Sequence, residues 1–354
     1  MDVSLGDIIE IVVFYEGWEN AMLHYGGLDF PSGFDISGLK PGPVEEEPVE
    51  EELEDPQSLE IPIPSSIDFE LISTYDTESA MGVALDGNYA YIADNLYGGL
   101  RVIDITDPYN PIEIGYQQTA GVTYSCVHIH LQFAYVCNGA SGTFEGNFIT
   151  SGLRVIDISD PTSPFEIGYI NVASSTYEVE FVDNYAYVAT NAKGLMIYDI
   201  SDPYSSIDLG GEIARFESES RVRDLEISES GFLYLADDMR GLKILDISDA
   251  SNPVQISSLD TSGIAYSVLL VEDFLIIADG SGGIEIVDVS NPYTPSFVLQ
   301  SENYTGEWWV LDEADGVVYG LSYALSESTT ITGFDTTNIP SLEVLGIYKS
   351  DTNI

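Results

Sequence analysis

The sequence has 354 residues, 44% of them hydrophobic, and it carries 10 basic against 60 acidic side chains, a formal net charge of −50. Its length and hydrophobic content allow one large core, whereas the shortage of basic residues argues against binding nucleic acid or anionic lipid, because both need a cationic surface. No apolar run reaches the ~18–20 residues of a membrane-spanning helix, so we expect no membrane insertion of this chain.

The N-terminal segment is interpreted as a degenerate copy of a repeat that recurs later in the chain. Residues 8–14 (IIEIVVF) predict a strand, and residues 16–37 can be laid over 315–337, with Gly-Phe-Asp at 33–35 matching Gly-Phe-Asp at 333–335. We therefore predict that 1–38 is a degenerate first copy of the unit described below, with 8–14 as its first strand. The alternative is a helical N-terminal extension, because the same residues also have helical spacing.

Residues 39–66 differ in composition from the rest of the chain. They contain nine acidic residues and six prolines, which leaves them unable to form a core or regular strands. We predict a disordered or extended insertion between the third and outer strands of the first unit. It is read as a solvated linker, with an acidic tether for a basic partner or Ca²⁺ as the alternative.

Residues 67–354 contain a clear repeat. The stretch GLRVIDITDP at 99–108 returns with few changes at 152–161, 194–203, 241–250 and 283–292, and in worn form at 330–338. Its central aspartates are Asp104, Asp157, Asp199, Asp246, Asp288 and Asp335. Their intervals of 42 to 53 residues suit propeller blades. Short β-branched and aromatic runs, cut by Gly, Asn, Asp and Pro, predict strands rather than helices.

Each unit is read as four antiparallel strands, A to D. In the third clear unit, 177–191 gives strands A and B around an Asp183-Asn184 turn, GLMIYDIS is strand C, and 206–213 is strand D. Four such strands make a propeller blade, stacked so that both faces are buried. The first strands begin near Met81, Tyr124, Tyr177, Arg223, Tyr266 and Trp308. Residues 67–76 add the outer strand of the first unit. The predicted fold is an all-β propeller of seven four-stranded antiparallel blades, with six as the alternative.

These units resemble the LVIVD repeat family of bacterial and archaeal β-propellers. The likeness is carried by GLRVIDITDPYNPIEIGY (99–116), GLRVIDISDPTSPFEIGY (152–169) and NYAYVAT (184–190), and it is strong over 66–300 and weak over 300–348. The resemblance implies a propeller that is usually exported or exposed at the cell surface. It implies no particular activity, because fold alone does not give function.

Two local motifs are first tested as metal sites. The repeated Asp-x-Ser/Thr-Asp-Pro stretch is read as a structural turn, with one Ca²⁺ per turn as the alternative. In CVHIH (126–130), a turn at Leu131-Gln132 places Cys126 opposite Cys137 and His128 opposite Tyr135. Cys126 and Cys137 are expected to form a disulfide or packed thiols, with a site made of Cys126, His128 and Cys137 as the metal-binding alternative.

A third candidate site is spread over one face of the propeller, where D–A and B–C loops emerge. It gathers the starts of the A strands and the ends of the B strands, together with the long insertion at 139–151. Aromatic and short polar side chains around a funnel suit a small neutral ligand, a glycan or a peptide, although blade packing and turn capping would need the same residues. The candidate ligand-binding residues are Tyr124, Tyr177, Arg223, Tyr266, Trp308, Asp94, Asn138, Asp237 and Asp279.

Catalysis finds little support, because the sequence lacks a G-x-S-x-G elbow, an H-E-x-x-H helix and a P-loop. We predict a non-enzymatic binding or adhesion scaffold, extracellular or at a prokaryotic cell surface, for a protein, peptide or glycan ligand. The start of the sequence lacks the basic segment of a signal peptide, so this location assumes that the chain is part of an exported protein. The expected cofactor is none, or Ca²⁺. Two alternatives are a cation-dependent hydrolase or lyase with carboxylates at the axial funnel, and a purely structural module of a larger surface protein.

Overall fold

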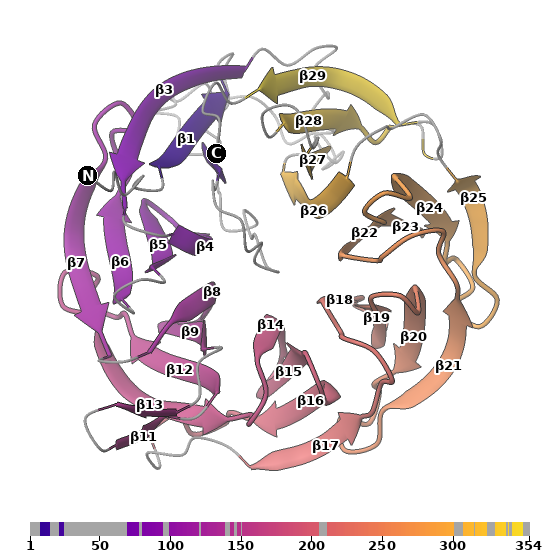
Figure 1. The fold of residues 1–354 in the computed structure, drawn as a ribbon, viewed down its shortest axis with the longest axis horizontal. Coiled ribbons are helices and arrows are strands. Elements are labelled where there is room, and N and C mark those ends of the chain that lie inside the picture. The colour runs from indigo at the N-terminus through magenta and orange to yellow at the C-terminus, as the bar shows by residue number, and fades with distance from the viewer. Residues whose placement is uncertain are drawn as a thin grey trace, which may run out of the picture.

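A computed structural model describes the strands of the propeller and most of the turns between them. The described residues are 8–14, 21–24, 69–77, 80–94, 99–119, 122–138, 142–144, 147–149, 151–204, 211–300, 307–314, 316–323, 330–337, 339 and 342–349. Their sheets stand like blades around a central axis, with the outer strands forming the circumference of the ring (Figure 1). The predicted insertion at 39–66 lies outside the described residues.

Six of the sheets are complete four-stranded antiparallel blades. The first three are β4 (Ala80–Asp86), β5 (Tyr89–Asp94), β6 (Gly99–Asp104) and β7 (Ile112–Gln118); β8 (Tyr124–His130), β9 (Phe133–Asn138), β12 (Gly152–Asp157) and β13 (Phe165–Asn171); and β14 (Thr176–Val182), β15 (Tyr185–Thr190), β16 (Gly194–Asp199) and β17 (Glu212–Phe216). The last three are β18 (Asp224–Ile227), β19 (Phe232–Ala236), β20 (Leu242–Asp246) and β21 (Val254–Leu259); β22 (Ser267–Val271), β23 (Phe274–Ala278), β24 (Ile284–Asp288) and β25 (Ser296–Gln300); and β26 (Glu307–Ala314), β27 (Val317–Tyr323), β28 (Thr330–Asp335) and β29 (Glu343–Lys349).

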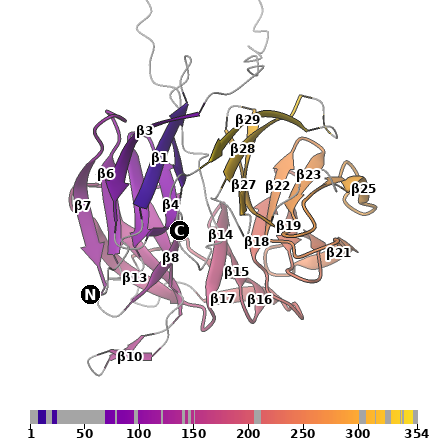
Figure 2. The same cartoon turned by 45° about the horizontal axis from the view of Figure 1, so that its top comes forward.

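The strand positions agree with the repeat pattern, apart from one outer strand. All six A strands begin within one residue of their predicted starts, and the recurring GLRVID segments are C strands. The strand predicted at 206–213 is β17, which begins only at Glu212. Its register explains the difference, because Ala214 pairs with Ile197 just as Gly115 pairs with Val102 in the first blade. The insertion between β9 and β12 contains a small hairpin, β10 (Gly142–Phe144) and β11 (Asn147–Ile149), which projects from the disc (Figure 2).

A seventh, three-stranded sheet completes the ring between β29 and the first complete blade (Figure 1). It consists of β1 (Ile8–Phe14), β2 (Ala21–His24) and β3 (Phe69–Asp76), in the order β2-β1-β3. The helical alternative therefore fails for the two described segments within 1–38. The prediction that 8–14 is the first strand of its sheet is also wrong, because β1 pairs directly with the outer strand β3.

The register identifies β1 as a C strand. Each complete blade has a bulge in its C–D pairing, such as the one between Val102 and Ile103, and the β1–β3 pairing has one between Ile11 and Val12. Ile11 pairs with Ser73 as Val102 pairs with Gly115. A bulge increases the local twist of a strand pair, which suits an outer strand that curves around the ring. The structure therefore has six four-stranded blades, the number given as the alternative, and the predicted seventh blade is a three-stranded sheet.

The repeated aspartates form hydrogen-bonded turns. In the first blade Asp104 Oδ1 accepts a hydrogen bond from the backbone N–H of Thr106 at 2.9 Å, and Asp107 Oδ1 accepts one from that of Tyr109 at 3.1 Å. An equivalent bond follows the C strand in each of the other five complete blades. Its acceptors are Asp157, Asp199, Asp246, Asp288 and Asp335. The bonds to Thr106 lower the pKa of Asp104 below its usual value. The turn interpretation of the motif is therefore confirmed.

The same turns hold neighbouring blades together. The hydroxyl of Ser257 on β21 donates to the carbonyl oxygen of Pro292, in the next blade, at 2.5 Å. Ser73 on β3 makes the same bond to Pro108 at 2.6 Å, so the three-stranded sheet docks as a complete blade does. At the equivalent position on β7, a Cβ on Gly115 would overlap the carbonyl oxygen of Pro161. A small residue is needed here because the turn of the next blade lies against the backbone.

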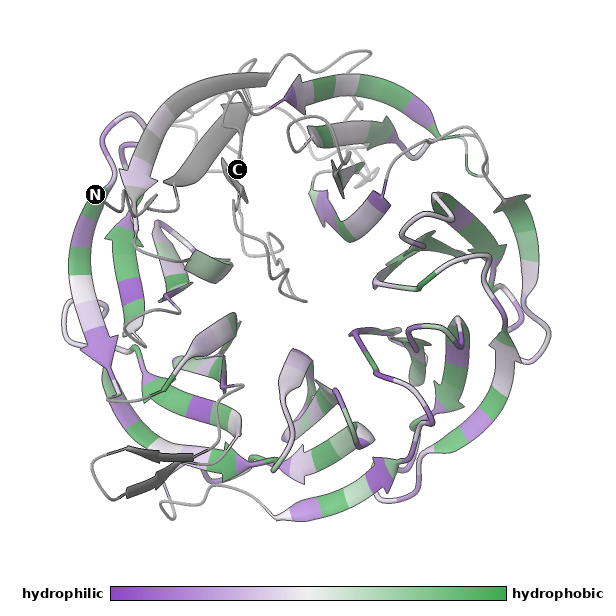
Figure 3. Ribbon diagram, viewed as in Figure 1, coloured by the Kyte–Doolittle hydropathy of each residue, from purple (hydrophilic) through white to green (hydrophobic). Residues whose placement is uncertain are grey.

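The core lies between blades, where clusters of buried apolar residues join neighbouring sheets. Many apolar residues lie on the middle strands, which are largely green in Figure 3. Every residue of β9 is buried, as expected for a strand covered on both faces. Recurring tyrosines on the B strands, Tyr91, Tyr135 and Tyr187, are at most 2% exposed and contribute to clusters that join neighbouring blades. Each such aromatic side chain contributes about 1.5–3 kcal/mol by burial.

Candidate functional site

The inner strands surround a cavity on the propeller axis. Residues of β8, β14, β18, β22 and β26 line a space of about 460 Å³. Consecutive residues of each of these strands contribute to the lining, among them 128–130, 178–181, 224–226 and 309–313. The ring architecture leaves this space open, because no strand of the described residues crosses the axis (Figure 1).

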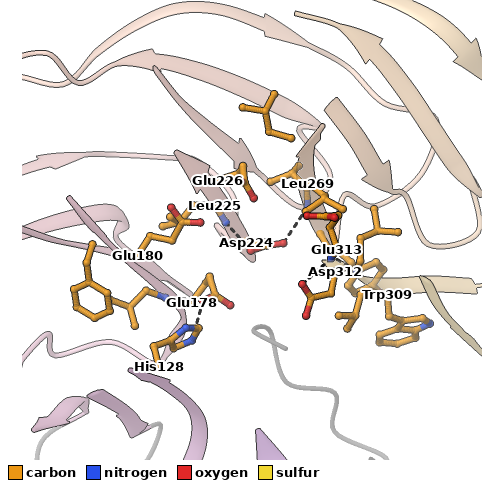
Figure 4. Close-up of a pocket in the computed structure, with 18 of the residues that line it drawn as sticks. His128, Glu178, Glu180, Asp224, Leu225, Glu226, Leu269, Trp309, Asp312 and Glu313 are labelled. Carbon is orange, nitrogen blue, oxygen red and sulfur yellow. Dashed lines mark hydrogen bonds and ion pairs between the residues drawn. The ribbon is translucent and has the colours of Figure 1, made fainter. Parts of the chain in front are cut away.

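The ionisable side chains of the lining are mostly acidic (Figure 4). Six carboxyl groups and two imidazoles line the cavity: Glu178, Glu180, Asp224, Glu226, Asp312, Glu313, His128 and His130. No Lys or Arg is among the described residues that line it. The cavity therefore has a strongly negative potential at neutral pH.

His128 and Glu178 are in buried contact between two blades, and the contact is an ion pair when His128 is protonated. Nε2 of His128 lies 2.8 Å from Oε1 of Glu178, and both side chains are less than 10% exposed. The same Oε1 accepts a hydrogen bond from the backbone N–H of Val179 at 3.0 Å, whereas Oε2 has no hydrogen-bond partner among the described residues. His130 stacks on Phe181 with ring centroids 4.6 Å apart, and burial lowers its pKa.

Asp224 connects the inner edges of two blades. Its Oδ1 accepts the backbone N–H of Leu225 at 2.8 Å, and its Oδ2 accepts that of Val268, on the next blade, at 2.9 Å. Burial, followed by the charge of Glu178, raises the pKa of Asp224 to about 7. Ser267 acts in the same way on the following blade, where its hydroxyl oxygen accepts the N–H of Leu311 at 3.2 Å.

These bonds satisfy backbone groups that face the axis. The innermost strand of a blade has one edge without a partner strand, and its N–H groups must find other acceptors when they are shielded from water. Sequence reasoning missed this role. The available signal was a polar residue at one A-strand position in three consecutive blades, Glu178, Asp224 and Ser267.

An aromatic stack lies at the mouth of the cavity. The guanidinium carbon of Arg223 lies 4.4 Å from the centroid of the Tyr266 ring, which stacks on Trp309 at 4.5 Å with an interplanar angle of 28°. Arg223 Nε also donates to Asp238. We call Arg223, Tyr266 and Trp309 the rim stack. It spans three consecutive blades, and Tyr266 and Trp309 also line the cavity.

A β-bulge near the start of the A strands determines which residue lies at the mouth of the cavity. Arg223 and Asp224 both lie opposite Ala236, so one extra residue is accommodated at the strand start. The same irregularity separates Trp308 from Val310, with Trp309 as the extra residue, and Tyr124 from Cys126. The sequence-predicted Tyr124 and Trp308 therefore occupy the preceding, buried position, 0% and 4% exposed. Tyr177, Arg223 and Tyr266 are partly exposed.

The predicted residues at the B-strand ends are buried inside the protein. Asp94 accepts a hydrogen bond from Arg101 Nε at 2.7 Å, Asp237 lies 3.4 Å from Lys243 Nζ, and Asp279 accepts the N–H of Gly263. Asn138 is fully buried as well. These four side chains are buried among their neighbours at the ends of the B strands. Their burial agrees with the alternative that blade packing and turn capping require these residues. Burial raises the pKa values of Asp237 and Asp279.

The cysteine register is as predicted. Cys126 pairs with Cys137 and His128 with Tyr135, around a turn at Leu131 and Gln132. The structure joins Cys126 and Cys137 in a disulfide with a Cα–Cα distance of 4.8 Å. Both thiols that a Cys₂His metal site needs are thereby used. Among the described residues no three His, Cys, Asp or Glu side chains come close enough together to hold a metal ion.

Comparison with known families places this repeat. The LVIVD repeat family matches residues 78–119, 148–172, 174–212, 221–261 and 262–303, more than half of the chain. The chain belongs to the LVIVD repeat family. The matched LVIVD repeats fall within the first five complete blades, with only β12 and β13 matched in the second, and the sixth blade, which begins at β26, is the degenerate copy.

Solved structures share the fold of these LVIVD repeats at low sequence identity. The periplasmic gluconolactonase of Pseudomonas aeruginosa is 11% identical, covers 97% of this chain and 96% of its own, and has a TM-score of 0.65. A hypothetical selenium-binding protein of Sulfolobus tokodaii is 11% identical over 79% of this chain and 84% of its own, with a TM-score of 0.60. Such likenesses show the fold alone. Among curated proteins no match was found, and no helix within the described residues could cross a bilayer.

Proposed function

We propose that this LVIVD-repeat propeller is a binding module whose ligand, a peptide, glycan or protein segment, enters the axial cavity past the rim stack. One observation carries the proposal: aromatic rings and an arginine at the mouth lead into a concave, polar cavity. Ligand sites typically combine aromatic contact surface with a few convergent polar groups in a space of ~300–1,000 Å³. The volume of about 460 Å³ falls within that range.

Peptide and glycan arrays test this proposal. We expect hits that are lost in the Tyr266→Ala and Trp309→Ala variants, because each removes one ring of the rim stack. Tyr109→Ala serves as the matched control, since Tyr109 is 62% exposed and lies on a C–D turn away from the cavity. Hits that survive both rim variants would place the ligand elsewhere, and an absence of hits would favour a purely structural module.

The proposed location is outside the cell or at its surface. The Cys126–Cys137 disulfide supports it, because disulfides persist in oxidising compartments and are rare in the cytosol. The source cells can be lysed into denaturant with an alkylating agent, and the protein analysed by mass spectrometry. We expect both cysteines to escape alkylation. Alkylated Cys126 and Cys137 in most of the protein would contradict export.

A second candidate is a hydrolase or lyase that uses carboxyl groups in the cavity. The observation in its favour is Asp224, whose pKa of about 7 would let it exchange a proton near neutral pH beside Glu178. Because one structural neighbour is a gluconolactonase, sugar lactones are the first substrates to assay. Turnover by the wild type that Asp224→Asn abolishes would support catalysis. Equal rates in both proteins would assign any turnover to a contaminant or to another site.

A further inference from the structure

The axial cavity combines an excess of carboxyl groups with a buried carboxylate oxygen that lacks a partner. We propose that it binds an organic cation through a primary ammonium group, carried by a linear polyamine or by a lysine side chain. This inference rests on the proposed function, because it names the ligand class of the same cavity.

The charge balance of the lining favours a cation. Three inner strands supply two carboxyl groups each: Glu178 and Glu180 from β14, Asp224 and Glu226 from β18, and Asp312 and Glu313 from β26. The only basic groups among the described lining residues are His128 and His130, and His128 is already paired with Glu178. An anionic ligand would be repelled, whereas a cation would reduce the repulsion among the carboxylates.

Glu178 provides an independent sign of a missing partner. The residue is only 5% exposed, and its Oε2 has no hydrogen-bond partner among the described residues. Figure 4 shows the side chain in the cavity, between His128 and Asp224. A buried carboxylate oxygen without a donor is costly, and an ammonium group entering the cavity would supply that donor.

The arrangement suits an ammonium group better than a metal ion. Ca²⁺ takes six to eight oxygen ligands at once, and the described carboxyl groups do not come together in threes. An ammonium group has three donors and is satisfied by fewer acceptors. The carboxyl groups are distributed over three blades, which matches amino groups spaced along a chain. Phe181 and Leu269 in the same lining offer apolar contact for the intervening methylene groups.

Isothermal titration calorimetry of the full chain tests the proposal, at pH 8 in 150 mM NaCl to screen the exposed charges. Spermidine is the polyamine probe, and acetyl-Gly-Lys-Gly-amide is the lysine probe. The variants are Glu178→Gln, Glu180→Gln and the control Glu343→Gln, whose side chain is exposed on β29, the outer strand of the sixth blade. We expect one saturable site, weakened at least tenfold by Glu178→Gln and changed less than twofold by Glu343→Gln.

Each outcome decides the question. Binding by spermidine alone assigns the site to free polyamines, and binding by the peptide assigns it to lysine side chains. The proposal is overturned if neither cavity variant weakens binding more than Glu343→Gln does, if binding does not saturate, or if Ca²⁺ displaces spermidine at equal concentration. If Glu178→Gln does not fold, Glu180→Gln decides alone. Array ligands that need Tyr266 but carry no amine would refute the ammonium proposal and leave the binding module standing.

Discussion

Asp224→Asn should remove a pH dependence of stability that the wild type shows between pH 5 and pH 8. The unfolded carboxyl group has a pKa of 3.8, and the folded one has a pKa of about 7. Between these values the folded protein holds a proton that the unfolded chain has released. Stability is therefore greatest while Asp224 is protonated, and it falls as the pH rises through about 7.

The magnitude follows from the same two values. At pH 5, two pH units below the folded pKa, the retained proton is worth about 3 kcal/mol, because each unit corresponds to about 1.4 kcal/mol. At pH 8 this contribution has vanished. The neighbouring groups that also titrate or carry charge are Glu178 and Glu180 on β14, Glu226 on β18, Asp312 and Glu313 on β26, and His128 and His130 on β8. Contributions of groups that do not interact with Asp224 cancel in the comparison of wild type and variant, whereas the coupling of Asp224 to Glu178 is removed together with the Asp224 carboxyl group.

Urea unfolding, followed by circular dichroism at pH 5 and pH 8, measures the effect. Asn cannot ionise, and its amide N–H₂ would face one of the two N–H groups that Asp224 now binds, so at pH 5 the variant should be about 1–3 kcal/mol less stable than wild type. At pH 8, where wild type has lost its contribution of about 3 kcal/mol, the variant should be as stable as wild type or slightly more stable. We expect the fall from pH 5 to pH 8 to be about 3 kcal/mol smaller in the variant. If Asp224→Asn and wild type lose the same free energy over this interval, the assignment to Asp224 is refuted. Glu343→Gln should behave as wild type.

Three further predictions concern the repeat and the disulfide. Asp104→Ala should lower the melting temperature at pH 7, and the difference from wild type should shrink below pH 3, because a carboxyl group with a lowered pKa stabilises the fold only while ionised; a difference that is constant with pH would contradict the turn assignment. Gly115→Ala should lower the free energy of unfolding in urea by about 1–3 kcal/mol, because the added Cβ meets the carbonyl oxygen of Pro161. The control Gly211→Ala, where nothing lies within 4 Å of the added Cβ, should lower it by less than about 0.5 kcal/mol. Equal losses in the two variants would show that the contact between the blades is not tight. Reduction of the Cys126–Cys137 disulfide, which joins residues 11 apart, should lower stability by about 2–3 kcal/mol, measured by unfolding with and without dithiothreitol in wild type and Cys126→Ser; a reductant effect that persists in Cys126→Ser would come from elsewhere.

The repeat made most of the fold predictable. Five similar copies in register locate strands and turns together, because an error in one copy is corrected by the others. The C strands and the Cys126–Cys137 register were obtained in this way. Where the copies diverge, the prediction failed. Strand 8–14 was assigned by likeness to a degenerate hairpin, but its place in the sheet depends on pairing with residues 69–76, across a long separation in sequence.

The candidate site was predicted less well, for two physical reasons. A bulge at the start of each A strand shifts the exposed position by one residue, so that Trp309 rather than Trp308 reaches the mouth of the cavity. No sequence pattern marks such a shift. The second reason is that Asp224 and Ser267 bind backbone groups of neighbouring blades. The backbone groups themselves cannot be read from a sequence, and the recurring polar residue at this A-strand position was hard to recognise because acidic residues are frequent throughout the chain.

The serine-to-proline contacts carry a consequence for the ring as a mechanical object. Ser73 reaches Pro108 and Ser257 reaches Pro292, so each fastening joins the outer strand of one sheet to the turn of the one that follows it in sequence. Only one junction joins the beginning of the chain to its end, where β29 lies beside β3 (Figure 1). We call this junction the seam. Breaking the contacts between β29 and β3 would open the closed ring into an arc and leave the serine-to-proline hydrogen bonds intact. At every other junction the two neighbouring sheets are also consecutive in the chain, so the seam is the junction at which the ring can open without separating sheets that the chain connects directly.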